Sequence, residues 1–265
     1  MENTFPPESP GIVTVRGADA VRFLNGQLTQ DVRHLGDETR LSCLTDAKGK
    51  LQHLVEVLAG PADGILWILC APEETDPVFE RLDRYLIADE VELGREPGSW
   101  TRIRSGGPLP EASFSRQAFW PDGWRDHWFK GSPAGLSTGG TEADREERRI
   151  RDGIPQRAVE AIVGMLPPEA GLDALAVSFE KGCFIGQETL SRIKSAGKVN
   201  RRLQRFALNG PAAPGDGIQM EGQPCGELTS VAPSGEAALG FLKKAAFGHR
   251  HFTLAGRPDS TLTVV

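Results

Sequence analysis

The chain has 265 residues, which is enough for one large domain or for two or three smaller ones with buried cores. Apolar residues make up 39% and charged residues 25%, and the formal net charge is −6, a composition that is typical of a soluble globular protein and disfavours wholesale nucleic-acid binding. The longest apolar run, Ile65–Ala71, is too short to span a bilayer.

The first hundred residues predict alternating strands and helices. A short β-branched segment predicts a strand over Gly11–Gly17, and apolar residues at spacings of three and four predict an amphipathic helix over Ala18–Leu35. The following segments predict two strands within 40–60 joined at DAKGK, a buried strand over 64–70, a helix over 77–87 and a strand over 90–94. This order, βαβββαβ, resembles a ferredoxin-like split unit with an extra strand and predicts an α+β domain.

The middle of the chain is irregular, because residues 104–141 are rich in Gly, Pro and Ser and indicate loops with short strands. Its three tryptophans, Trp120, Trp124 and Trp128, could form a stacking platform for bases. The segment WPDGW favours a hairpin turn instead, with an aromatic side chain on each side. A helix is expected over 141–153, supported by an i,i+4 pair between Glu147 and Arg151.

From about residue 200 the chain consists of short alternating segments broken by Gly, Pro and Asp. Strands at this spacing predict a small β-barrel or a β-sandwich.

The segment EKGCFIGQE, residues 180–188, combines a lysine, a cysteine and two glycines. It predicts a helix that starts near Gly186, with Cys183 just ahead of its N-terminus and close to Lys181. Free helix amides and an ammonium group both stabilise a thiolate, so this thiol is expected to ionise more easily than a free cysteine. The alternative is that Cys183 is an inert buried residue and Gly186 a helix cap.

A basic strip begins at the same segment. Between residues 181 and 205 the only acid is Glu188, and the basic residues are Lys181, Arg192, Lys194, Lys198, Arg201, Arg202 and Arg205. On an acidic protein such a strip can steer an anionic ligand, although it can also be a solvated helix face.

KGCFIGQE resembles the K-G-C-[FY]-x-G-Q-E signature of the YgfZ-type folate-binding proteins, which are relatives of the glycine-cleavage aminomethyltransferase, or T-protein. The similarity extends along most of the chain. The matching segments, in order, are GADAVRFLNGQLTQDV, LTDAKGKL, RIRDGIP, MLPPEAGLD, CGELTSVAP and ALGFLKK.

The resemblance implies an aminomethyltransferase-like three-domain fold around a central channel: α+β domains over residues 1–100 and 101–199, which can interleave, and a β-barrel over 200–265. It implies binding of tetrahydrofolate or a derivative, and support of iron–sulfur cluster assembly in client enzymes, including tRNA-modifying ones. Lys181 and Cys183 are the implied functional pair. The implied folate-binding residues are Gln27, Asp31, Gly182, Gly186, Gln187, Glu188 and Arg192.

One departure separates two branches of this superfamily. Where the transferase branch has paired aspartates after the first hairpin turn, this chain has Gln52 and His53. An amide cannot serve as the anionic partner of a cationic iminium, so aminomethyl transfer becomes the alternative. A non-catalytic folate-binding module and an RNA-binding protein are further alternatives. The pair His249 and His251 lacks other recognisable ligands, so no metal is expected there.

Cysteine usage indicates the compartment. The four cysteines, Cys43, Cys70, Cys183 and Cys225, form no C-x-x-C pair, and the first eleven residues lack the features of a signal peptide. We therefore expect a reduced, cytoplasmic protein whose partners are folate and iron–sulfur client enzymes or assembly factors, with no membrane and no direct nucleic-acid contact.

Overall fold

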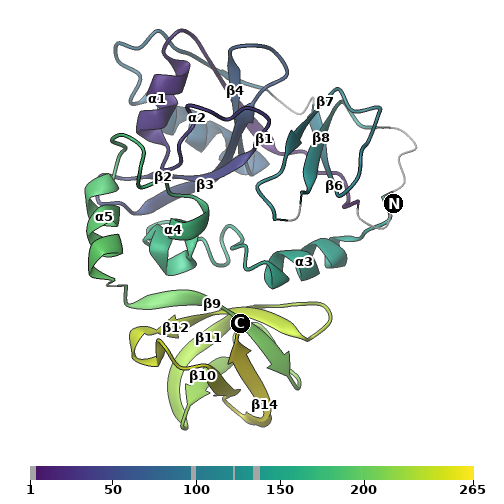
Figure 1. The fold of residues 1–265 in the computed structure, drawn as a ribbon, viewed down its shortest axis with the longest axis vertical. Coiled ribbons are helices and arrows are strands. Elements are labelled where there is room, and N and C mark those ends of the chain that lie inside the picture. Colours follow the sequence, from purple (N-terminus) through teal and green to yellow (C-terminus); the bar gives the residue numbers. More distant parts are fainter. Residues whose placement is uncertain (1–3, 97–99, 122, 134–137, 198) are drawn as a thin grey trace. The chain divides into compact units, whose positions relative to one another are not determined.

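The computed structural model describes residues 4–96, 100–121, 123–133, 138–197 and 199–265, without the side chain of Pro258 (Figure 1). Two compact units make up the chain. One comprises Met1–Thr141 and Leu175–Gln187, and the other comprises Glu142–Ala174 and Glu188–Val265. The boundaries of the three expected domains stay a prediction, whereas the α+β class is confirmed.

The first unit contains a five-stranded antiparallel sheet in the order β2-β3-β4-β1-β5. The predicted order of strands and helices is confirmed. The elements are β1 (Gly11–Arg16), α1 (Ala20–Gln27), β2 (Arg40–Thr45), β3 (Leu51–Ala59), β4 (Ile65–Cys70), the 3-10 turn η1 (Pro72–Glu74), α2 (Thr75–Asp83) and β5 (Glu92–Arg95).

Each face of this sheet is covered by a different layer. Helices α1 and α2 pack on one face through residues such as Leu24 and Leu82. On the other face, Trp67 packs against a three-stranded antiparallel sheet, β6-β8-β7. Its strands are β6 (Trp100–Ser105), β7 (Phe114–Gln117) and β8 (Arg125–Lys130).

The tryptophans of the middle segment belong to the core of this unit. Trp120 and Trp124 flank the β7–β8 turn with their ring centroids 6.2 Å apart, as the hairpin interpretation predicts. Asp122 lies outside the described residues. Trp128 is fully buried, so these side chains offer no exposed platform for stacking bases.

The predicted helix over Ala18–Leu35 is wrong in its second half. Helix α1 ends at Gln27, and the backbone of Leu28 is extended. The reason is tertiary: Leu28 forms a β-bridge with Leu44, and the Thr29 amide donates to the Cys43 carbonyl at 3.0 Å. Pairing with β2 therefore outweighs the helical periodicity. Helix α2 likewise ends at Asp83, earlier than expected.

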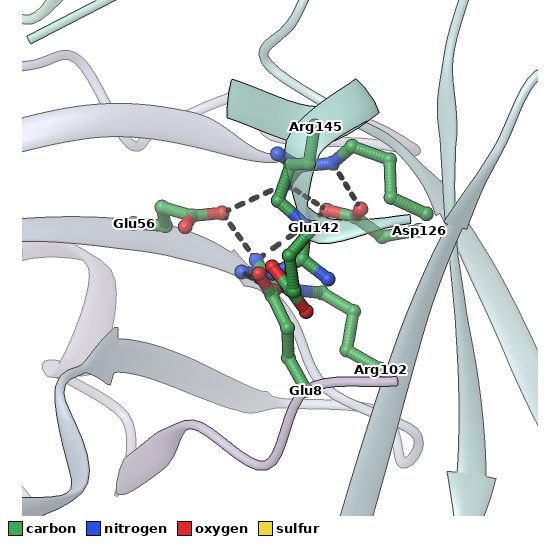
Figure 2. A network of polar contacts seen from close by, with 7 residues as sticks. Glu8, Glu56, Arg102, Asp126, Glu142 and Arg145 are labelled. Carbon is green, nitrogen blue, oxygen red and sulfur yellow. Dashed lines mark hydrogen bonds and ion pairs between the residues drawn. The ribbon is translucent and has the colours of Figure 1, made fainter. Parts of the chain in front are cut away.

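A buried network of charged side chains joins the two sheets of the first unit (Figure 2). Arg102 on β6 donates to Glu56 on β3 at 2.6 Å and to Glu8 at 2.6 Å. Arg104 pairs with the fully buried Asp126 of β8 at 2.7 Å. Since these buried charges are paired, the network fixes how the sheets pack rather than offering a free ionic site.

The second unit contains a closed six-stranded barrel in the order β10-β11-β12-β9-β14-β13, which confirms the barrel alternative of the sequence (Figure 1). Phe206 and Leu262 lie at its centre. The strands are β9 (Arg201–Asn209), β10 (Gly217–Met220), β11 (Gln223–Val231), β12 (Ala237–Lys243), β13 (His251–Leu254) and β14 (Arg257–Val264).

The helices expected in the second half of the chain are also present. Helix α3 (Glu142–Arg151) contains the predicted Glu147–Arg151 ion pair at 2.5 Å. Helix α5 (Gln187–Ala196) starts directly after Gly186, as the motif predicts. The remaining elements are η2 (Pro167–Ala170), α4 (Leu172–Leu175) and η3 (Lys244–Ala246).

Candidate functional site

The segment that leads into α5 lies against the loop after α1 and the end of β2, all within the first unit. The Ile185 amide donates to the Gly26 carbonyl at 3.2 Å, and the Ser178 amide donates to the Thr29 carbonyl at 3.0 Å. The Thr45 hydroxyl donates to the Ile185 carbonyl at 2.5 Å. The structure thus brings residues more than a hundred positions apart into one site.

Lys181 is buried, with 5% of its surface exposed. Its Nζ donates to the main-chain carbonyls of Leu28 at 2.7 Å and Gln30 at 2.8 Å. Burial lowers the pKa of Lys181 to about 7; the carboxylate of Asp31 opposes this shift and the guanidinium of Arg33 adds to it. The amine therefore holds the loop after α1, and its pKa lies near neutral pH.

The two glycines of the motif differ in their surroundings. Gly186 has a φ of 86°, and a Cβ there would lie 2.7 Å from the Asp46 carbonyl oxygen and 2.7 Å from the Gly49 Cα. Because Gly186 has no side chain, its backbone can pack directly against the β2–β3 turn. Gly182 has open space around it, so it leaves the backbone beside Lys181 uncovered.

Gln27, the last residue of α1, belongs to a buried polar cluster around Arg81 of α2. The Arg81 guanidinium donates to the side-chain oxygens of Gln27 at 3.0 Å and Gln52 at 2.6 Å, and to the Thr45 carbonyl at 3.0 Å. Sequence reasoning missed Arg81, because it occupies one polar position among several on an amphipathic helix.

A β-bulge places Gln52 in this cluster. The register of β2 and β3 passes from the Leu44–His53 pair to the Thr45–Leu51 pair, so Gln52 is the extra residue on β3. Such bulges re-aim a side chain. The neighbouring His53 instead contacts Glu74, with 3.3 Å between Nδ1 and Oε1.

Asp31 follows the carbonyls that bind Lys181. The Arg33 guanidinium donates two hydrogen bonds to its carboxylate, from Nε to Oδ1 at 3.0 Å and from Nη2 to Oδ2 at 2.5 Å. The hydrogen bond from Arg33 is the main reason that the pKa of Asp31 lies well below its usual range, and the charge of Lys181 contributes. Asp31 therefore stays ionised beside the site and balances part of its positive charge.

Cys183 is the exposed member of the four cysteines, all of which are described; Cys43, Cys70 and Cys225 are buried. Burial raises the pKa of Cys43 to about 12 and also raises that of Cys225. Cys183 lies between the buried Lys181 and the start of α5, where a reagent or partner in solvent can reach its thiol.

The remaining predicted residues stand at the start of α5. Gln187 is half-buried, and its main-chain N–H donates to the Phe184 carbonyl at 3.1 Å. Glu188 and Arg192 are exposed and pair with each other at 2.6 Å.

The arginines of the basic strip on β9 have partners of their own. Arg201 pairs with Glu169 at 3.4 Å and Arg202 with Asp173 at 3.4 Å, while Arg205 donates to the Arg151 carbonyl at 2.6 Å. Lys198 lies outside the described residues. These arginines are therefore not a free cationic surface.

A cavity of about 280 Å³ opens next to the loop that Lys181 holds. Gln30, whose carbonyl binds Lys181, lines it together with Leu41, Phe119 and Trp120. Thr39 also lines the cavity, and its hydroxyl is buried without a hydrogen-bond partner among the described residues. No sequence pattern indicates this cavity, because its wall comes from three distant segments.

No group of three or more His, Cys, Asp or Glu residues in the described ranges could hold a metal ion. None of the helices in the part of the chain that the structure describes has the length and apolar character needed to cross a membrane.

The fold is that of the aminomethyltransferases. The structure matches the crystal structure of the glycine cleavage system aminomethyltransferase T from Bartonella henselae with a TM-score of 0.79, over 99% of this chain and 84% of that chain. The two sequences are 16% identical, so this likeness shows the fold alone.

Two curated relatives are similar to the chain over most of its length. The chain is 28% identical to the mitochondrial iron–sulfur cluster assembly factor IBA57 of Mus musculus, over 92% of this chain and 75% of that protein. It is 25% identical to the tRNA-modifying protein YgfZ of Cronobacter sakazakii, over 83% of this chain and 80% of that protein. No protein-family model matches the chain. The chain is therefore similar in sequence to proteins named YgfZ and IBA57, and it has the fold of an aminomethyltransferase.

Proposed function

We propose that this protein binds tetrahydrofolate or a derivative and supports the assembly or maintenance of iron–sulfur clusters in client enzymes, including enzymes that modify tRNA. Two relatives carry names of this kind, an iron–sulfur cluster assembly factor and a tRNA-modifying protein. The observation that carries the proposal is the exposed Cys183 beside the buried Lys181, in a segment fixed to the rim of a cavity.

The cavity fits one part of a folate. A pterin is a flat heteroaromatic ring whose edges carry hydrogen-bond donors and acceptors. Leu41, Phe119 and Trp120 supply apolar and aromatic surface, and the polar side chains of the lining include Gln30, Glu38, Arg40 and Gln117. Small-molecule sites combine apolar surface with polar groups that fix the orientation of the ligand. In this proposal the ring system occupies the cavity.

The predicted folate contacts have unequal support. Gln27 and Gly186 are engaged within the protein, so they would shape the site rather than touch the ligand. Gly182 and Gln187 remain available near Cys183. Arg192 would bind an anionic group only after leaving Glu188, an exchange that costs little because exposed ion pairs are weak.

The surroundings of Gln52 favour this function over aminomethyl transfer. In place of a carboxylate, the site has a neutral amide whose oxygen accepts a hydrogen bond from Arg81. A guanidinium disfavours a cationic iminium in its vicinity by charge repulsion.

The functional part of the proposal is tested in cells that lack this protein. Wild type, Cys183→Ser and the exposed neighbour variant Glu180→Gln are each produced at equal level, and the iron content and activity of an iron–sulfur tRNA-modifying enzyme are measured. We expect wild type and Glu180→Gln to restore the enzyme and Cys183→Ser to fail. Full restoration by Cys183→Ser would contradict the role assigned to the thiol.

A further inference from the structure

Arg81 is a buried cation that is held entirely by neutral groups. Its exposed fraction is 5%, and its three nitrogens donate to two amide oxygens and one main-chain carbonyl. Among the residues that the structure describes, no carboxylate forms an ion pair with it. Burial lowers the pKa of Arg81 from its ordinary value. A buried charge without a counter-ion is costly, so the three hydrogen bonds and the Tyr85 ring, whose centroid lies 4.1 Å from the guanidinium carbon, have to stabilise it.

The three acceptors of Arg81 come from three elements that border the site. Gln27 ends α1, Thr45 ends β2, and Gln52 is the bulged residue of β3. The planar guanidinium presents its donors in a fixed fork, so it can hold three groups at set angles. A lysine in the same place would present a single nitrogen.

Thr45 connects Arg81 to the KGCFIGQE segment. The Thr45 carbonyl accepts from Arg81 at 3.0 Å, and its hydroxyl donates to the Ile185 carbonyl at 2.5 Å. Thr45 itself is fully buried; its hydrogen bond with Arg81 is buried, and its hydrogen bond with Ile185 is partly buried. One residue therefore links the guanidinium to the backbone two positions after Cys183.

A second connection runs through the loop after α1. Arg81 fixes the side chain of Gln27, and Lys181 binds the carbonyls of Leu28 and Gln30. Two buried basic side chains, one from α2 and one from the motif, therefore hold the same short segment. This segment also forms part of the cavity wall at Gln30.

We propose that Arg81 is a positioning residue that sets the geometry of the KGCFIGQE segment and of the adjoining cavity through Thr45 and Gln27, without contact to the ligand. The prediction that it tunes ligand affinity rests on the proposed function. The prediction that it orders the Cys183 segment does not, because that order can be measured on the protein alone.

The test compares Arg81→Met, which keeps an apolar stem but removes all the donors, with Arg81→Lys and with the exposed control Arg84→Met. Each is made in wild type and in Thr45→Val, which lacks the hydroxyl that bonds to Ile185. Hydrogen exchange of the Ile185 amide and alkylation of Cys183 report on the segment, and titration with 5-formyltetrahydrofolate reports on the ligand.

We expect Arg81→Met to speed exchange at Ile185 at least tenfold while amides of β12 stay protected, and to change the alkylation rate of Cys183 severalfold. Arg81→Lys should show the same change in smaller measure. In Thr45→Val, the further effect of Arg81→Met should shrink, because the two residues act along one path. Arg84→Met should match wild type.

Equal effects of Arg81→Met in both backgrounds, or exchange that rises evenly over the first unit, would overturn the proposal and leave Arg81 a general stabiliser. If Arg81→Met does not fold, the same criteria apply to Arg81→Lys. Wild-type protein that fails to bind folate would refute the proposed function alone, since the exchange measurement decides the positioning role independently.

Discussion

Gly186 and Gly49 meet so closely that a Cβ on Gly186 would stand 2.7 Å from the Gly49 Cα. The substitution Gly186→Ala should therefore destabilise the protein by about 2 kcal/mol or more, because it adds a left-handed backbone strain to a backbone clash. Gly182→Ala is the matched control, since nothing surrounds that position, and should change stability by no more than about 0.5 kcal/mol. Urea denaturation measures both; equal losses would contradict the packing described.

Alkylation should distinguish Cys183 from the other three cysteines. Its thiol is exposed, whereas Cys43, Cys70 and Cys225 are buried, with a raised pKa for Cys43 and Cys225. We expect Cys183 to react with iodoacetamide at least tenfold faster at pH 7.5, with mass spectrometry following each site. Comparable rates at all four sites would refute the assignment.

Stability should depend on pH through Lys181. Its pKa is about 7 in the folded protein and 10.5 in an ordinary setting, so the unfolded chain binds the additional proton between these values. The free energy of unfolding should therefore rise with pH from about 7 upward, by at most about 1.4 kcal/mol per pH unit. Well below pH 7 both states are protonated, so Lys181 should cause no change of stability with pH there.

Lys181→Met removes this titration, so its stability should gain less than wild type between pH 7 and pH 9. Denaturation curves at pH 6.5, 7.5 and 8.5 measure the difference between the two proteins. A difference that stays constant with pH would show that Lys181 keeps its proton throughout.

Aminomethyl transfer should be absent. Incubated with tetrahydrofolate and aminomethyl-loaded H-protein, wild type should release neither methylenetetrahydrofolate nor ammonia. Gln52→Asp should not restore the reaction, because Arg81 already donates to this position and would neutralise the new carboxylate. Product formation by wild type at rates typical of an enzyme would reverse the order of the two functional alternatives.

Local patterns were sufficient to predict most elements. The strands of the first hundred residues and of the barrel are short segments separated by turn residues, and the start of α5 follows from Gly186 and the polar first turn. The pairing of Trp120 with Trp124 at the β7–β8 turn also followed from the WPDGW segment.

The site depends on contacts that no local pattern encodes. The segment after Gln27 keeps a helical spacing, yet pairing with β2 and the bonds from Lys181 hold it extended. The bulge that turns Gln52 toward Arg81 arises from the register of two strands, which alternation alone cannot reveal. Lys181 looked like a partner for the thiol, but its described hydrogen bonds go to carbonyls.

The most direct test of the central claim is calorimetric titration of wild type, Lys181→Ala and the exposed control Lys244→Ala with tetrahydrofolate and 5-formyltetrahydrofolate. If the loop that Lys181 holds forms part of a folate site, wild type and Lys244→Ala should bind alike and Lys181→Ala at least tenfold more weakly, with its fold intact by circular dichroism. Absence of binding to wild type, or equal affinity in Lys181→Ala, would contradict the account.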